Sequence, residues 1–318
     1  MAEAVANTAI EVPSSKFQKG MRRAGWAALF TFALLLFTLM KLPETRIKNY
    51  VQGNISAALA PRGITLNAAQ SSLSVGFGIS YSMKDVTLSF ATPQAPIHID
   101  RIEVSPSILS MIIGKMGGRF WIYNGDGTLK GAFSMSTRST KQDIDASFTI
   151  HEMNLGKLGV FPLAANIQGS AIANGEASVT GDLNLPGTFN GSVDLNLNKI
   201  TLDQQSIQGF AVPRLSISEG KIDVAMNQGK ATIKTLKLGK PGSTTDDIIA
   251  NVTGDIQLGK QWESSTMNLK TRFSLSQNVL KSFVLIDALL GNGKQSDGSY
   301  AFNLTGPLDS PAAAPGTP

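Results

Sequence analysis

The chain of 318 residues has no cysteine and only two histidines, which excludes a disulfide scaffold and makes a zinc site improbable. Charged residues make up only 16% of it, far from the composition of a helical bundle. The net charge of +5 comes with no basic cluster interleaved with aromatic residues, so we expect no nucleic-acid binding. Nucleophile-elbow and phosphate-loop motifs are also missing. We therefore expect no enzyme, with no catalytic residue, no metal and no cofactor.

The polar residues that could carry chemistry have simpler explanations. His98 and His151 each follow an isoleucine, which predicts exposed strand histidines. The run Asn124-Gly-Asp126-Gly resembles part of a calcium loop but lacks the closing glutamate, so a hairpin turn is favoured. Asp143 and Asp145 share one face of a predicted strand, where a solvated surface is the better interpretation than acid–base chemistry.

One long apolar run occurs near the N-terminus. Residues 24–40 carry no charge, which is just enough for a helix that spans a membrane. The sequence after the run offers no small-x-small cleavage site, so an uncleaved anchor is favoured over a signal peptide. The predicted anchor residues are Trp26, Leu29, Phe30, Phe32, Leu34, Leu35, Leu36, Phe37 and Leu39. A slight excess of basic residues before the run predicts a cytoplasmic N-terminus and a periplasmic bulk if the cell is Gram-negative.

The rest of the chain alternates apolar and polar residues with a period of two, which indicates β-strands with one apolar face. We predict a disordered cytoplasmic tail (1–20), a transmembrane anchor (21–42), a periplasmic β-rich domain (43–308) and a disordered tail (309–318). Residues 43–60 are predicted to form an amphipathic helix. Two further helices are predicted from Ser105 to Met116 and from Asn278 to Leu290, with caps and glycine stops at their ends.

The fold class that follows is mainly β: a long, curved, mostly antiparallel sheet with two or three short helices. So few helices cannot cover the apolar face, so the sheet must form a trough, a sandwich or a partly closed barrel. A dry core and a lipid-lined groove both remain open as uses of that face. The residues assigned to it are Leu73, Val75, Phe77, Ile79, Val193, Leu195, Leu197, Met267, Leu269 and Phe273.

The order of segments adds a family resemblance. A signal anchor leads into a helix that starts at Pro43 and ends near Ala60-Pro61-Arg62-Gly63, and the domain closes with the segment from Gly298 to Pro311. In this, residues 22–311 resemble the type II secretion system protein N family in its delta-proteobacterial form, and more distantly the AsmA-like proteins of the periplasm. The first resemblance implies a non-catalytic inner-membrane accessory of protein secretion. The second implies lipid binding or lipid transfer in the cell envelope.

Two functional hypotheses therefore stand. In the first, the β-domain docks other secretion-system envelope proteins while its anchor lies in the lipid bilayer of a bacterial inner membrane. In the second, it holds phospholipid in an apolar groove. A third hypothesis is a receptor for periplasmic substrates, but no residue of the sequence supports it.

Overall fold

A computed structural model describes residues 49, 52–53, 55–57, 59–75, 79–91, 96–107, 110, 114–136, 142–165, 167–207, 210–282 and 289–316. The chain divides into two units, residues 1–51 and 52–318, and the second carries the fold described below. The predicted tail (1–20) and anchor (21–42) lie outside the described residues. Within the described part, no helix has both the length and the apolar character that crossing a membrane requires.

The second unit is mainly β-structure. Its strands are β1 (Ile64–Val75), β2 (Ile79–Phe90), β3 (Ile97–Pro106), β4 (Lys115–Asn124), β5 (Gly127–Ser136), β6 (Asp143–Asn154), β7 (Gly169–Asp182), β8 (Leu185–Leu202), β9 (Gln205–Ile207), β10 (Phe210–Val212), β11 (Leu215–Asn227), β12 (Lys230–Leu238), β13 (Ile248–Gln257), β14 (Thr266–Leu275), β15 (Tyr300–Pro307) and β16 (Ala312–Pro315). Its short helices are η1 (Ala60–Arg62), α4 (Val160–Ala165), η2 (Trp262–Ser264), α5 (Gln277–Ser282) and η3 (Gly291–Gly293).

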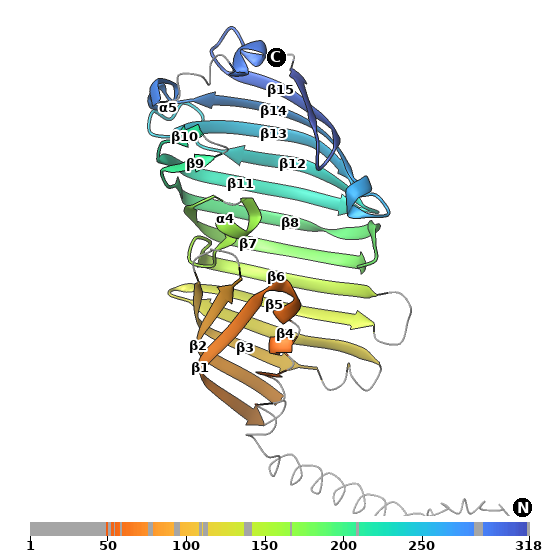
Figure 1. Cartoon of the computed structure of the whole chain (residues 1–318). Coiled ribbons are helices and arrows are strands. Elements are labelled where there is room, and N and C mark those ends of the chain that lie inside the picture. Colours follow the sequence, from red (N-terminus) through yellow and green to blue (C-terminus); the bar gives the residue numbers. More distant parts are fainter. Residues whose placement is uncertain are drawn as a thin grey trace, which may run out of the picture. The chain divides into compact units, whose positions relative to one another are not determined.

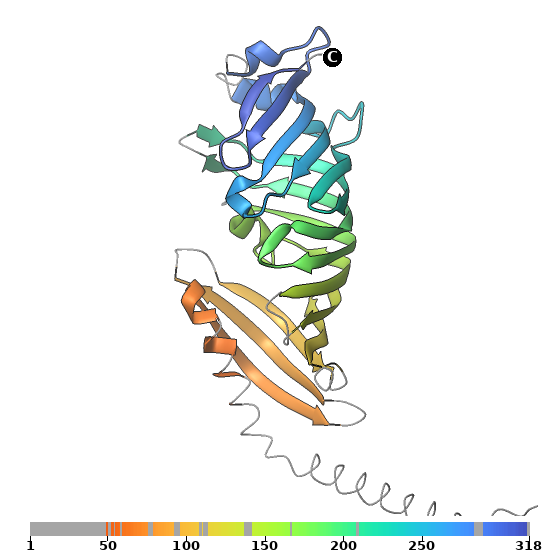
Figure 2. The same ribbon diagram turned by 90° about the vertical axis from the view of Figure 1, so that its right-hand side faces the viewer.

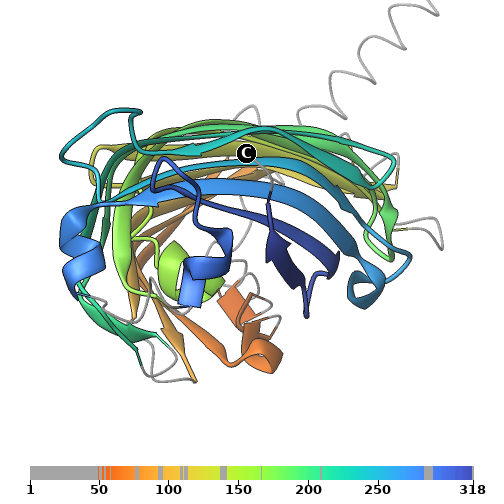
Figure 3. The same ribbon diagram turned by 90° about the horizontal axis from the view of Figure 1, so that it is seen from above.

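Fourteen of the strands form one antiparallel sheet in chain order, from β1 at one edge to β16 at the other. Only β9 and β10 stand apart, as a two-stranded sheet inserted between β8 and β11. The ladder does not close on itself, because β1 and β16 do not pair. Figure 1 shows the stack of strands, and Figure 3 shows that they arch, with α4 on the concave side. The open trough was thus the correct one of the three predicted arrangements.

The alternating run at residues 73–83 is not one strand. It folds back as a hairpin in which Leu73 on β1 lies opposite Tyr81 on β2. Side chains directly opposite each other share a face, so both halves keep the predicted apolar face. Gly76 and Gly78 stand at two of the non-apolar positions of this run, so the alternation continues through them. The two-residue period alone therefore did not reveal the hairpin.

The helix predicted from Ser105 to Met116 is wrong at both ends. Ser105 and Pro106 end β3, and Lys115 and Met116 begin β4. The capping side chain is Ser107 instead, whose Oγ accepts a hydrogen bond from the Ser110 amide at 3.3 Å. Proline is tolerated at the end of a strand, where a missing N–H costs no ladder bond.

The other predicted helices fare better. The described residues between 49 and 59 are helical, and Gly63 ends the following 3-10 turn in the left-handed conformation with φ of 68°. Helix α5 begins at Gln277, one residue before the predicted start, and the Val279 amide donates to Ser276 Oγ at 3.3 Å. Helix α4 was not predicted.

The C-terminal segment, expected to be disordered, instead adds strand β16, where Ala313 pairs with Leu304.

Two bulges keep the apolar face continuous along the strands. Glu152 on β6 and Lys199 on β8 adopt positive φ angles of 48° and 52° at shifts in the ladder register. An extra residue reverses the alternation, so side chains on both sides of the bulge reach the same face. Beyond the bulges, buried Ala171, Ile200 and Ile217 form a small core against which Phe161 of α4 packs.

Candidate functional site

The apolar face is built from cross-strand rows that run the full width of the sheet. One row starts on β1 and passes through every strand of the large sheet to β16. Its residues, each paired with the next, are Leu73, Tyr81, Val104, Phe120, Gly131, Phe148, Ala177, Val193, Val224, Ile233, Gly254, Leu269, Leu304 and Ala313. This row contains no charged side chain.

A second row lies beside the first. Its residues are Ser71, Met83, Ile102, Ile122, Leu129, Ile150, Gly175, Leu195, Ile222, Leu236, Val252, Thr271, Phe302 and Pro315. Only Ser71 and Thr271 are polar. With strands about 4.8 Å apart, fourteen strands make an apolar path about 60 Å long.

The structure brings most of the predicted face residues together. Val193, Leu195 and Leu197 alternate along β8, and Met267, Leu269 and Phe273 do so along β14, in rows linked by the ladder. Leu73 and Ile79 lie on the same face at the β1–β2 hairpin. Phe77 lies outside the described residues, as does the side chain of Val75. The predicted anchor residues from Trp26 to Leu39 lie outside them as well.

These apolar side chains are only half-buried. Val193, Leu195, Leu197, Met267, Leu269 and Phe273 all keep part of their surface exposed. Helix α4 reaches one end of the face through Phe161, whose partners in the small core are fully buried. Because α4 packs on this face and lies inside the arch (Figure 3), the apolar face is the concave one. It is therefore the lining of a trough rather than a closed core.

The lining deepens near the C-terminal edge. A hollow of about 390 Å³ lies between β13, β14 and β15, with Val252, Phe273, Leu290, Phe302 and Leu304 among its walls. Phe273 stacks on Tyr300 with ring centroids 5.5 Å apart and on Phe302 at 6.3 Å. Stacking between these rings stabilises this side of the hollow. Sequence alternation predicted Phe273 here but could not show that two rings from β15 join it.

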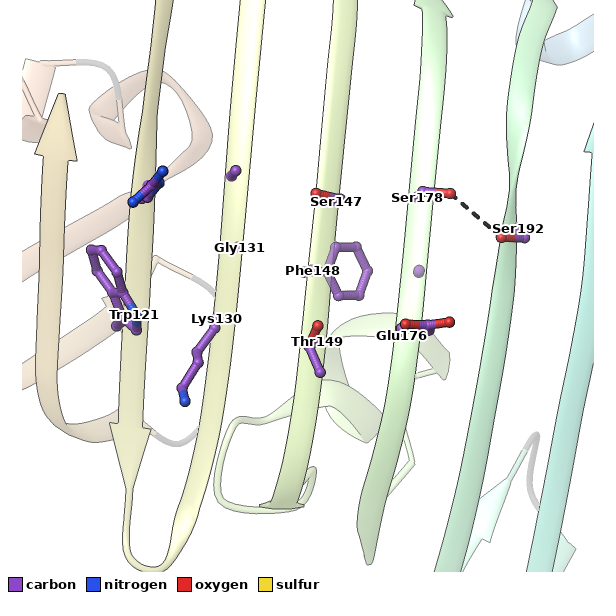
Figure 4. A pocket seen from close by; sticks show the side chains of 12 residues that line it. Trp121, Lys130, Gly131, Ser147, Phe148, Thr149, Glu176, Ser178 and Ser192 are labelled. Carbon is purple, nitrogen blue, oxygen red and sulfur yellow. Dashed lines mark hydrogen bonds between the residues drawn. The ribbon is translucent and has the colours of Figure 1, made fainter. Parts of the chain in front are cut away.

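The opposite, convex face is polar and carries a second hollow of about 500 Å³ over β4 to β8 (Figure 4). Its floor is low because Ala132, Ser147 and Ser178 are small, and Ser178 and Ser192 share a hydrogen bond at 3.4 Å. Trp121, Lys130 and Glu176 stand around this floor. No group of three or more metal-ligating side chains occurs among the described residues, here or elsewhere.

Charged groups gather on the convex face and at the strand ends. Lys230 pairs with Asp255 at 3.1 Å, and both side chains are largely exposed. At the start of β15, hydrogen bonds from Ser299, together with the Arg272 guanidinium at 2.7 Å, lower the pKa of Asp297 to about 2. His98 and His151 are exposed, and His98 Nδ1 lies 3.1 Å from Thr87 Oγ1. Arg272 also borders the hollow between β13, β14 and β15.

The chain was compared with protein-family models, with curated proteins and with solved structures, and none of the three comparisons finds a match.

Proposed function

We propose that the chain is a non-catalytic lipid-binding protein of the cell envelope, and that the concave face of its sheet holds acyl chains. The observation that supports this most directly is the pair of largely apolar rows that cross the open sheet from β1 to β16. Tyr81, Met83, Ala177 and Ile233 are buried in these rows, but most of the other apolar side chains stay partly exposed. Exposed apolar surface costs about 25 cal/mol per Å² in water. A trough that long is stabilised by a ligand that covers it.

The chemistry of the face narrows the class of ligand. Inside a sheet the backbone N–H and C=O groups are already paired with neighbouring strands, so the face offers a ligand almost nothing but apolar side chains. A peptide laid along it would bury its own backbone groups without partners, at a cost of about 1–3 kcal/mol for each group. An acyl chain has no hydrogen bonds to lose, and so it suits this lining.

Neighbouring residues on β8 provide a test with a built-in control. Leu195 lies on the concave face, whereas Asn196 is exposed on the convex face. A photo-reactive amino acid at position 195, activated in cells, is expected to cross-link to phospholipid, whereas the same group at position 196 is expected to remain free of lipid. If position 195 yields only protein adducts or none, the proposal is wrong.

A second candidate function, an accessory of type II protein secretion that docks partner proteins, is favoured by the edge strand β1. Its twelve residues contain no charge and no proline, the features that usually protect sheet edges, and among the described strands β1 pairs only with β2. A partner strand could extend the sheet there. Cross-linked envelopes, purified through this chain, are expected to contain secretion components under this hypothesis. Their absence, together with lipid adducts at position 195, would leave lipid binding alone.

A further inference from the structure

Three large apolar side chains project from turns at one rim of the sheet, outside the trough. Leu183 and Leu185 lie at the turn between β7 and β8, and Trp262 lies in η2 between β13 and β14. Their exposed fractions are 40%, 41% and 55%. We call these three residues the Leu–Trp tip. Figures 1 and 2 both show the β7–β8 turn and η2 side by side at this end of the strands.

The turns that carry the tip are tied to one another. Trp262 packs edge-on against Phe189 of β8, with ring centroids 6.0 Å apart. The Gly229 amide, in the turn between β11 and β12, donates to the Phe189 carbonyl at 2.8 Å, and the Leu258 amide donates to the Gly229 carbonyl at 2.7 Å. Three turns from separate hairpins therefore form a single platform under Trp262.

Local hydrogen bonds hold the exposed residues in place. The Leu183 amide donates to the Gln142 carbonyl at 3.1 Å. On the other turn, Ser264 Oγ donates to the Gln261 carbonyl at 2.8 Å and fixes η2. The tip is thus an apolar surface that the fold keeps in water on ordered turns, and such surfaces mark interaction sites.

From this arrangement we infer that the Leu–Trp tip inserts into the interfacial layer of a lipid bilayer. The three side chains project from turns and are surrounded by exposed polar residues, among them Asn184, Lys260 and Gln261. Protein-binding hot spots are usually packed in the centre of a desolvated patch, whereas separate projecting side chains match insertion between lipid headgroups. The amphipathic ring of Trp262 suits that layer, and Lys260 can reach the headgroups beside it. This inference does not depend on what fills the concave face.

The absence of cysteine allows a clean experiment with the full chain. Leu183→Cys, labelled with the fluorophore NBD, would be reconstituted into vesicles of phosphatidylethanolamine and phosphatidylglycerol, with and without doxyl-labelled lipids. Asp126→Cys is the control, because Asp126 is exposed in the β4–β5 turn, at the opposite end of the strands and away from the concave face. We expect blue-shifted emission that doxyl lipids quench for L183C, and water-like, unquenched emission for D126C.

Two further measurements keep the inference falsifiable. Adding Trp262→Ser and Leu185→Ser to the L183C chain is expected to return its emission to the water-like value, while circular dichroism shows the sheet intact. Water-like emission from L183C itself would overturn the inference. So would blue-shifted emission that doxyl lipids leave unchanged and that fades when the protein is diluted in the vesicles, since this would indicate contact between two copies.

Discussion

The ring of Phe120 on β4 lies over Gly131 on β5, its direct cross-strand neighbour, and occupies the space that a side chain would need. A Cβ at Gly131 would also meet the Ser147 carbonyl oxygen at 2.9 Å. The ring can rotate away, but the backbone of β6 cannot. In this part of the trough lining, a large ring on one strand therefore packs over a glycine on the next strand.

Replacing Gly131 with valine should therefore destabilise the sheet. We expect a loss of about 1–3 kcal/mol in the free energy of unfolding, measured by urea denaturation. Gly53→Ala is the control, because Gly53 is helical and no atom other than those of its chain neighbours and its own helix backbone lies within 4 Å of its would-be Cβ. Alanine there should stabilise the helix by about 0.5–1 kcal/mol. Equal stability of G131V and the natural chain would contradict the packing described.

A second prediction concerns Asp246, a buried carboxylate before β13. It accepts hydrogen bonds from the Ser218 amide at 2.6 Å, from Ser218 Oγ at 2.9 Å and from the Lys240 amide at 2.7 Å. Burial acts to raise the pKa of Asp246, but these hydrogen bonds outweigh burial and the pKa lies below 3.8. Asp246→Ala leaves two backbone donors without an acceptor, so we expect a loss of about 2–4 kcal/mol in urea. Asp309→Ala, at an exposed site, should change stability by less than about 0.5 kcal/mol.

The sequence predicts the features that neighbouring residues determine, and it misses those that depend on pairing between strands. The period of two predicts strands, and it places Val193 and Leu269 on one face although 75 residues separate them, because the ladder keeps that face in register. It does not predict the hairpin between Leu73 and Tyr81, since the two residues keep the even spacing that a single strand would also give them. Strand β16 was missed because alanine and proline have low strand propensity, and only pairing with β15 makes that segment extended.

The candidate site was harder to predict than the strands. Whether Leu195 is buried depends on whether the sheet closes over it, which is set by the edges at β1 and β16, far from residue 195. The alternation therefore predicted the lining but left its exposure open. The Leu–Trp tip was not predicted, because the contact between Phe189 of β8 and Trp262 arises only from the packing of the strands between them.

Acid should weaken the C-terminal edge of the sheet through Asp297. Hydrogen bonds from Ser299, then the charge of Arg272, lower the pKa of Asp297 from 3.8 to about 2. A lowered pKa means that the stabilisation is complete above pH 3.8 and is lost as the pH falls towards 2. Asp297→Asn should remove this dependence, so that its unfolding free energy falls less between pH 4 and pH 2 than that of the natural chain. Ser299→Ala should remove more of the dependence than Arg272→Lys, and the reverse order would contradict the assignment.

The last prediction separates the fold from the ligand. Leu195→Asp places a charge in the middle of the apolar lining, and Asn196→Asp places the same charge one residue further along, on the convex face. Because Leu195 is only partly buried, the charge keeps part of its hydration, so we expect L195D to lose only about 1–3 kcal/mol and to remain folded. Acyl chains would meet that carboxylate directly. Phospholipid recovered with the purified chain, measured by mass spectrometry, should therefore fall in L195D and stay unchanged in N196D. Equal lipid recovery from both folded variants would show that the lipid binds elsewhere, and that the concave face is closed to it.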